Sequence, residues 1–268
     1  MRDASLDLFD LAALDAALAS TIFGGNLHFT PVTDSTNADA LEAARGGAPH
    51  GSVYFADEQL AGRGRGGHDW QSPAGGGLYV SVLLRPAIPA ARLPQLPLAA
   101  GLAAADAIRT VAELTVDLRW PNDLLIGARK AGGILVESKI EGPMAAFAVV
   151  GMGINVHQRS FDPGLSTPAT SLDLESGRQI PRQPLLAALL ESLEREALGL
   201  SDPAAIATIP ARVEKASTWI RGRRVEVHGP QACTGGTAGL DKNGFLLVQT
   251  DEGLVTVQTG GIRSVKIG

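Results

Sequence analysis

Gln59-Leu-Ala-Gly-Arg-Gly-Arg-Gly-Gly-His-Asp-Trp70 alternates glycine with arginine and ends on an indole, and this stretch decides how the chain is interpreted. The glycines at positions 62, 64, 66 and 67 allow peptide N–H groups to approach a ligand closely. Arg63 and Arg65 add forked positive charge that suits phosphate or carboxylate oxygens. The combination predicts a binding loop for a phosphate that carries a flat base, although the run by itself fits a flexible surface loop equally well.

Two nucleotide-binding motifs overlap this loop, and neither fits it. The spacing Gly62-x-Gly64-x-x-Gly67 matches a dinucleotide fingerprint, but a poor helix opening follows and Val80 stands where a ribose-binding acid is expected. A P-loop needs Lys followed by Ser or Thr after its last glycine, whereas His68 and Asp69 follow here. The loop therefore belongs to neither class.

The composition indicates a globular chain with room for one large domain and a small one. It has 268 residues, of which 45% are hydrophobic and 19% charged. The single cysteine, Cys233, excludes an internal disulfide framework and fits a reducing compartment. No apolar run approaches the length of a membrane span, and the first residues lack the pattern of a signal peptide, so we expect a cytoplasmic protein. The net charge of −5 argues against a general nucleic-acid binder.

Mixed strands and helices without a strict βαβ rhythm predict an α+β fold, with a mixed sheet flanked by helices, over residues 1–217. Apolar spacing and capping residues place the helices. We expect helices over 6–20, 93–113, 183–200 and 203–217, and an alanine-rich helix that follows the capping residues 34–37 and runs through 45. We expect strands over 27–32, 53–57, 78–84, 115–120, 124–126, 133–137 and 146–156.

After a boundary near Thr218 the pattern changes to short strands only, which predicts a small SH3-like barrel over residues 218–268. With about 50 residues this unit is marginal by itself, so we expect it to dock on the larger domain. Gly260-Gly261 is read as a tight hairpin turn. Its strands are expected over 225–228, 233–239, 245–249 and 254–258.

A second group of reactive side chains follows in Arg119-Trp-Pro-Asn-Asp123 and Arg129-Lys130. Pro121 stops a strand, and Asn122 and Asp123 then offer hard oxygens in a turn, which suits Mg²⁺ held mainly by substrate phosphates. An ordinary turn with a capping Asp is the alternative. Lys130 lies just before a glycine pair and an apolar strand, either facing a ligand or simply solvated.

The third element is Val149-Val-Gly-Met-Gly-Ile-Asn155, an apolar strand interrupted by glycines. Glycines inside a strand mark a close approach of backbone or ligand, or else a bulge. This segment alone does not separate the two.

Taken in order, these motifs closely resemble the biotin protein ligases. The resemblance extends from about Leu27 to the C-terminus, including the small barrel. Five motifs carry it: Ser35-Thr-Asn37, Gln59 to Trp70, Arg119 to Asp123, Lys130-x-x-Gly-Ile-Leu-Val-Glu137 and Gly151-x-Gly-Ile-Asn155. It implies the biotin-lipoate ligase fold, similar to class II aminoacyl-tRNA synthetases.

The resemblance also implies a reaction. A biotin carboxylate attacks the α-phosphate of ATP, with Mg²⁺ present, to give biotinyl-5′-AMP and pyrophosphate. The biotinyl group then passes to a lysine on a biotin carboxyl carrier domain of acetyl-CoA carboxylase or a related carboxylase. A homodimer is expected, with no nucleic acid and no membrane as partner.

The roles of individual residues are carried over by motif. Lys130 and Arg63 are the expected catalytic residues. The expected biotin contacts are Ser35, Thr36, Asn37, Gln59, Gly62, Arg63, Arg65, Lys130, Gly133 and Gly151. The expected ATP contacts are Arg63, Arg65, Trp70, Asn122, Lys130 and Asn155, with Asp123 as an Mg²⁺ ligand.

Some relatives also repress transcription through an N-terminal helix-turn-helix domain. Only 34 residues precede Ser35, so we expect the monofunctional type. The chain departs from the family pattern at His68, Asp69 and Ala131-Gly132, which puts the affinity of the loop for nucleotide in doubt. The alternatives are a lipoate or octanoyl ligase-type acyltransferase, a nucleic-acid-binding module using Arg-Gly contacts, and an inactive biotin sensor.

Overall fold

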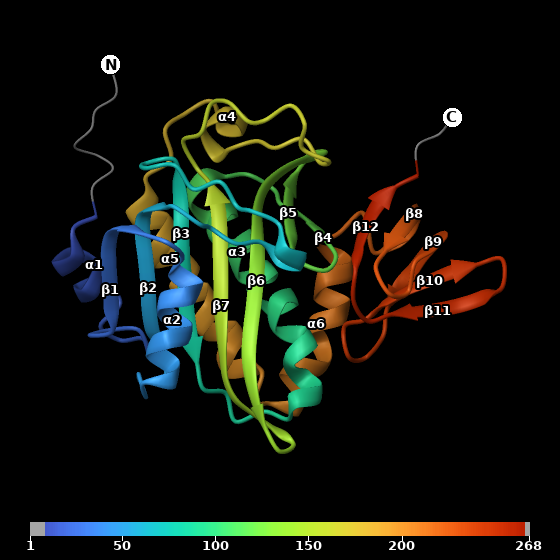
Figure 1. The fold of residues 1–268 in the computed structure, drawn as a ribbon, viewed down its shortest axis with the longest axis horizontal. Coiled ribbons are helices and arrows are strands. Elements are labelled where there is room, and N and C mark those ends of the chain that lie inside the picture. The colour runs from blue at the N-terminus through green and yellow to red at the C-terminus, as the bar shows by residue number, and fades with distance from the viewer. Residues whose placement is uncertain (1–8, 266–268) are drawn as a thin grey trace.

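A seven-stranded mixed sheet forms the centre of the larger part of the molecule (Figure 1). The computed structural model describes residues 9–265. Strands β1 and β2 run parallel, and every other neighbouring pair in this sheet is antiparallel, as the predicted α+β class requires. The order across the sheet is β1 (Leu27–Thr33), β2 (Ser52–Gln59), β3 (Gly77–Leu84), β7 (Met144–Asn155), β6 (Arg129–Glu141), β5 (Asp123–Ile126) and β4 (Asp117–Arg119).

Helices cover both faces of this sheet, which explains why all eight residues of β3 are buried. Helices α3 (Leu96–Ala112) and α5 (Arg182–Gly199) pack behind it, and α2 (Thr36–Arg45) lies in front (Figure 1). The alanines of α3 let it approach the sheet closely. Helix α6 (Pro203–Lys215) lies between the sheet and the C-terminal strands. None of the helices within residues 9–265 is long and apolar enough to span a membrane.

Several element boundaries differ from the expectations. Helix α1 covers only Leu11–Ala17 because the Asp10 side chain caps it, and residues 6–8 of the expected helix lie outside the described ones. Strand β6 is longer than 133–137 because it pairs with β7 along almost its whole length. The short helix α4 (Leu172–Ser176) was not expected, since five residues carry too little periodicity to recognise.

The C-terminal strands form a five-stranded antiparallel sheet, consistent with an SH3-like unit. Its order is β11 (Gly253–Val257), β10 (Leu246–Thr250), β9 (Cys233–Leu240), β8 (Arg221–His228) and β12 (Gly261–Ser264). The prediction of a hairpin turn at Gly260-Gly261 is wrong for Gly261, which opens β12 and pairs with His228. Only Gly260 turns the chain, with φ +126°. The domain boundary at Thr218 stays a prediction.

The turn between β9 and β10 anchors the C-terminal sheet to the larger part of the molecule. Gln95 donates from its side chain to the Lys242 carbonyl at 2.8 Å, and the Trp120 indole donates to the Gly244 carbonyl at 3.1 Å. Gly244 has φ +84°, and a Cβ there would lie 2.6 Å from a methyl carbon of Leu98. Glycine at this position therefore serves both the turn and the interface.

We expect Gly244→Ala to lower the free energy of unfolding more than Gly222→Ala does. Gly222 has φ +76° but no atom within 4 Å of the added Cβ, so its substitution isolates the backbone strain, about 1–2 kcal/mol. Gly244→Ala adds overpacking against Leu98, about 1–3 kcal/mol more. Urea unfolding of both variants measures the difference. Equal losses would contradict the role assigned to this turn in docking.

Candidate active site

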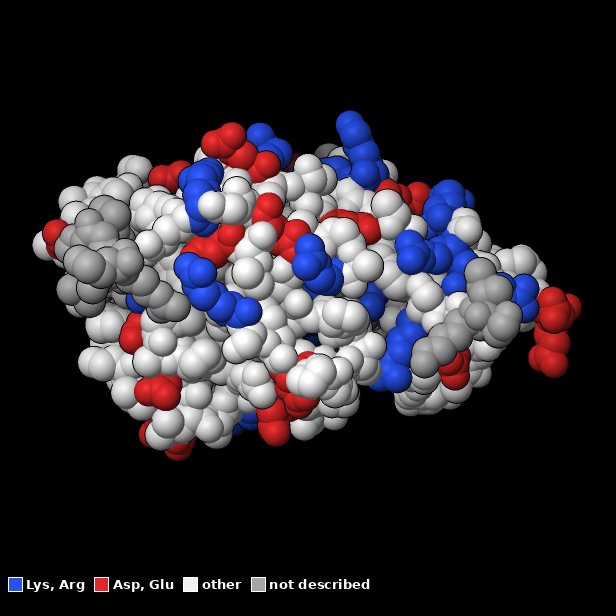
Figure 2. Space-filling model, turned by 90° about the horizontal axis from the view of Figure 1, so that it is seen from above, with Lys and Arg blue, Asp and Glu red and all other residues white. Residues whose placement is uncertain are grey.

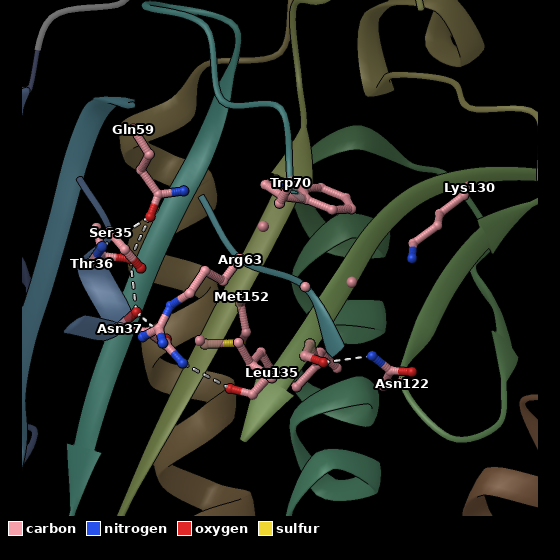
Figure 3. Close-up of a pocket in the computed structure, with 16 residues that line it drawn as sticks. Ser35, Thr36, Asn37, Gln59, Arg63, Trp70, Asn122, Lys130, Leu135 and Met152 are labelled. Carbon is pink, nitrogen blue, oxygen red and sulfur yellow. Dashed lines mark hydrogen bonds between the residues drawn. The ribbon is translucent and has the colours of Figure 1, made fainter. Parts of the chain in front are cut away.

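A pocket of about 440 Å³, counted to its open mouth, lies on the face of the main sheet that carries α2 (Figure 3). Strands β3, β7 and β6 form its floor, and the N-terminus of α2, residues 60–71 and the turn between β4 and β5 surround it. Sixteen residues line it: Ser35, Thr36, Asn37, Gln59, Arg63, Gly64, Trp70, Ser81, Asn122, Lys130, Gly133, Ile134, Leu135, Gly151, Met152 and Gly153.

The wall beside α2 is a connected hydrogen-bond network. The Gln59 side-chain oxygen accepts from both the backbone N–H (2.9 Å) and the hydroxyl (3.1 Å) of Thr36. The Thr36 and Ser81 hydroxyls lie 2.8 Å apart, and the Ser81 hydroxyl donates to Asn37 Oδ1 at 2.6 Å. The Gln59 amide nitrogen donates to the Ser72 hydroxyl at 2.7 Å. These polar atoms are thus held in place before any ligand arrives.

Ser35 differs from the rest of this wall. It is the N-cap residue of α2, yet its side chain makes no capping hydrogen bond, and its residue is 4% exposed. Within residues 9–265 no hydrogen bond of its hydroxyl is found, although the residue lines the pocket. A capping residue that leaves the cap unmade keeps its hydroxyl available for something else.

The glycines of β7 allow side chains from other elements to pack directly against the backbone of this strand. A Cβ on Gly151 would overlap the Oδ1 atom of Asn37, and a Cβ on Gly153 would overlap the indole nitrogen of Trp70. The pairing of β7 with β3 and β6 is regular at both positions, so these glycines mark close approach and not a bulge. Asn37 and Trp70 occupy the space that larger residues would fill.

Residues 60–71 fold over the pocket as a closed loop. The two ends of the loop, which form its neck, pair with each other. The backbone N–H of Trp70 donates to the Gly62 carbonyl at 2.9 Å, and Gln59 forms a β-bridge with Ser72. A Cβ on Gly62 would meet the Ser72 hydroxyl at 2.8 Å, so Gly62 is needed for this neck, and it is not among the lining residues. At the tip, Gly66 and Gly67 have φ +71° and +79°.

Trp70 lies in the pocket against the floor. Its indole nitrogen is buried with no hydrogen-bond partner among residues 9–265, and the Lys130 ammonium is 5.4 Å from the ring centroid. The nitrogen packs against Gly153 on the floor of the pocket, so the unpaired N–H is a cost of this close packing.

The two loop arginines point to different places. Arg63 lines the pocket and lies 3.3 Å from the Glu137 carboxylate, which also accepts from the Asn37 side chain at 2.9 Å. Arg65 instead binds the C-terminal sheet, donating to the Gly260 carbonyl and, at 2.8 Å, to the Thr259 hydroxyl. The structure therefore brings Arg63 to the pocket and holds Arg65 outside it.

Lys130 stands at the opposite end of the pocket from the polar wall (Figure 3). Its ammonium lies 2.5 Å from Asp123 Oδ1, while Arg119 donates to Asp123 Oδ2 at 2.6 and 3.0 Å. Burial alone would raise the pKa of the Asp123 carboxyl, but the charges and hydrogen bonds of Lys130 and Arg119 outweigh it and hold this pKa below its usual range. Asp123 is thus an ionised clamp on Lys130.

The backbone around Lys130 is fixed as well. Its N–H donates to the Pro168 carbonyl at 2.8 Å, and its carbonyl accepts from the Thr170 N–H at 2.9 Å. Buried Asn155 donates to the Thr170 carbonyl at 3.0 Å, so it supports this segment and does not line the pocket. Asn122 lines the pocket and donates to the Ile134 carbonyl at 2.7 Å.

The acidic side chains do not form a cage for a metal. Within residues 9–265 no three His, Cys, Asp or Glu side chains are grouped to hold an ion. Both oxygens of Asp123 already bind cations, so as they stand these residues do not fit a metal held by the protein. Asp123 as an Mg²⁺ ligand stays a prediction.

Most of the expected site residues come together, and a few lie elsewhere. The pocket gathers Ser35, Thr36, Asn37, Gln59, Arg63, Trp70, Asn122, Lys130, Gly133 and Gly151. Gly62, Arg65, Asp123 and Asn155 lie beside it in supporting positions. Six further lining residues are not among the predicted ones: Gly64, Ser81, Ile134, Leu135, Met152 and Gly153. Ser81 carried a signal, as the one serine in the apolar run 78–84.

Comparison with known proteins links this arrangement to one family. The model of the biotin/lipoate A/B protein ligase family matches residues 29–155, which build most of the pocket. The bifunctional ligase/repressor BirA of Escherichia coli is 34% identical over 243 residues, covering 91% of this chain and 75% of that protein. The biotin--[acetyl-CoA-carboxylase] ligase of Mycobacterium tuberculosis is 36% identical over 241 residues, covering 86% and 85%.

Solved structures agree. The biotin protein ligase of Aquifex aeolicus, in complex with biotin and ATP, superposes with a TM-score of 0.77 at 30% identity, covering 89% of this chain and 98% of that one. Similarity of this extent in sequence and in fold, with the pocket inside the matched region, shows that the chain belongs to the biotin protein ligase family.

Proposed function

We propose that this protein joins biotin to ATP to form biotinyl-5′-AMP and pyrophosphate, and then transfers the biotinyl group to a carrier lysine of a biotin-dependent carboxylase. The observation that carries the proposal is the layout of the pocket. A polar wall lies at one end, a cationic Lys130 at the other, and apolar Leu135 and Met152 between them (Figure 3). Biotin has the same layout, with a ureido ring and a carboxylate joined by an apolar chain.

The polar wall supports recognition of the ureido ring. Its oxygen and two N–H groups need buried partners of opposite character, and Ser35, with its free hydroxyl, is the first candidate. Thr36, Asn37 and Gln59 are already fixed by one another, so they present their remaining lone pairs and hydrogens in set directions. A lipoyl or octanoyl chain could not pair with this wall, which disfavours the lipoate alternative.

Lys130 is proposed to act on the first step. A biotin carboxylate oxygen forms a bond to the α-phosphorus of ATP as the bond to pyrophosphate breaks, and the electron pair leaves with pyrophosphate. Two anions must meet, and an ammonium already oriented by Asp123 offsets their charge without reorganisation. The nucleotide enters as its Mg²⁺ complex, which is the substrate.

The remaining residues are proposed to hold the nucleotide. Arg63 contacts the phosphates from within the pocket, and Trp70 contributes a ring face near the base. Arg65 turns from the C-terminal sheet toward the phosphates, because an anion is a better acceptor for a guanidinium than a carbonyl and a hydroxyl. The loop then shields the mixed anhydride from water.

In the second step the amine of a carrier lysine attacks the biotinyl carbonyl carbon, an amide forms and AMP leaves. The related ligases are named for acetyl-CoA carboxylase, and we propose the carrier domain of such a carboxylase as the partner. The homodimer, the cytoplasmic location and the absence of a nucleic-acid or membrane partner stay predictions.

We expect Lys130→Ala to lower kcat for biotin-dependent pyrophosphate release at least about 10²-fold, because it removes a preorganised charge at the reacting oxygens. Lys139→Ala is the matched control, since Lys139 lies on the same strand with an exposed ammonium paired to Glu141. Pyrophosphate release with MgATP and transfer to a purified carrier domain are measured together.

Each other outcome of this assay favours an alternative. Biotin binding without pyrophosphate release by the wild type would indicate a sensor. Release that requires lipoate in place of biotin would indicate the lipoate-type enzyme. Full activity of Lys130→Ala would remove Lys130 from the reaction.

We expect Ser35→Ala to weaken biotin binding about tenfold and to leave the unfolding transition unchanged, because its hydroxyl makes no hydrogen bond in the described structure. Ser81→Ala is the contrasting variant, since Ser81 bonds both Thr36 and Asn37 and its loss should lower stability. Calorimetric titration and thermal unfolding separate the two. A destabilised Ser35→Ala with wild-type affinity would refute the assignment.

We expect Asp123→Asn to lower the free energy of unfolding at pH 7 by about 1.5–3 kcal/mol, the scale of hydrogen bonds to charged groups. The pKa of Asp123 is lower in the folded protein than its unfolded value of about 3.9, so its ion pairs contribute fully above that pH. The contribution is lost as the pH falls through the folded pKa. Urea unfolding at pH 7, 5 and 3 should show the difference shrinking only at pH 3, and a constant difference would contradict it.

A further inference from the structure

Trp219, just before the first strand of the C-terminal sheet, contacts two guanidinium groups with its ring. The Arg119 Cζ atom is 5.1 Å from the Trp219 ring centroid, and the Arg223 Cζ atom is 3.9 Å from it. Trp219 is 6% exposed and Arg119 8%, so the contact between them is largely removed from water, where cation–π attraction is strongest. Arg119 belongs to β4 of the main sheet, and Arg223 belongs to β8 of the C-terminal sheet.

Arg119 links Trp219 to the Lys130 ammonium of the pocket through Asp123. Arg119 uses two nitrogens on one oxygen of Asp123, at 2.6 and 3.0 Å, and leaves the other oxygen to Lys130 at 2.5 Å. Arg119 on one oxygen and Lys130 on the other together fix both oxygens of the carboxylate. The orientation of Asp123, and with it the position of the Lys130 ammonium, therefore depends on how Arg119 is held.

The backbone ties Trp219 to the same strand. The Ser217 hydroxyl binds the Leu118 carbonyl and also accepts from the Trp219 N–H at 3.0 Å. The Thr218 N–H and hydroxyl donate to Asp117 at 2.8 and 2.6 Å. Lys and Arg side chains gather on the side of the molecule that carries the C-terminal sheet (Figure 2). The Trp219 indole is a contact partner that Arg119 and Arg223 share.

We propose that Trp219 and Arg223 are positioning residues for Lys130, acting through Arg119 and Asp123, so that the C-terminal sheet sets the geometry of the reacting cation. The proposal rests on the proposed function for its kinetic consequence, but the positioning itself exists without ligand. The C-terminal sheet then has a role at the cationic end of the pocket.

The kinetic test compares Trp219→Leu with Trp219→Phe. Leucine removes the ring face, and we expect kcat for pyrophosphate release to fall about tenfold with the KM for biotin unchanged, because a slight displacement of a reacting group is costly. Phenylalanine keeps a ring face and should restore most of the rate. Arg223→Gln should act in the same direction, whereas Arg224→Gln, an equal charge change at an exposed neighbour on β8, should not.

A double-mutant cycle separates positioning from general damage. If Trp219 acts through Asp123, Trp219→Leu should slow an Asp123→Asn enzyme by much less than tenfold, because the link is already broken. An equal loss in both backgrounds would overturn the proposal. So would a Phe variant as slow as the Leu variant, or equal effects of Arg223→Gln and Arg224→Gln.

A second measurement does not depend on activity. Reductive methylation followed by mass spectrometry reports how accessible the Lys130 amine is, with Lys139 as the internal reference. We expect faster modification of Lys130 in Trp219→Leu and Arg223→Gln than in the wild type, and wild-type protection in Trp219→Phe. Unchanged protection in both would overturn the proposal even if the wild type were active. An inactive wild type with the expected change in protection would refute only the proposed function.

Discussion

The carboxylate of Asp123, shared between Arg119 and Lys130, is the interaction on which the cationic end of the pocket depends. The Lys130 ammonium needs an oppositely charged partner, which is the Asp123 carboxylate. That carboxylate must itself be fixed, because an unrestrained one would move together with the lysine side chain. Arg119 provides that hold with two hydrogen bonds. Strands β4 and β5 place Arg119 and Asp123 at the two ends of one tight turn.

The opposite end of the pocket follows a different rule. There the side chains are neutral, and they satisfy one another through Gln59, Thr36, Ser81 and Asn37 before a ligand binds. A network of this kind costs little to keep and cannot rearrange without leaving a buried group unpaired. It can therefore discriminate between ligands by shape and hydrogen-bond pattern, whereas Lys130 distinguishes only charge. The two ends divide recognition and reactivity between them.

How far the sequence predicts this site depends on the kind of contact. The glycines at 151 and 153 mark from sequence either a close approach or a bulge, and only the structure, with Asn37 and Trp70 packed against them, decides for close approach. The direction of the Arg65 side chain is not predictable in this way, since its acceptors, Gly260 and Thr259, are nearly two hundred residues away, in the connection between β11 and β12. Motif order identifies which residues gather in one region, but only packing decides which of them face the cavity and which support it.

For the proposed function, Arg65 shows how the loop over residues 60–71 can link the pocket to the C-terminal part of the chain. In the structure its guanidinium is satisfied by a carbonyl and a hydroxyl, both neutral, so holding it there requires no anion. A nucleotide phosphate offers charge-assisted hydrogen bonds of roughly twice that strength, so the exchange is favourable only when the phosphate is present. The glycines at 66 and 67, both with positive φ, permit the backbone change that such a turn requires. The C-terminal part of the chain thereby contacts the site at two places, through Arg65 at the loop and through Trp219 at Arg119.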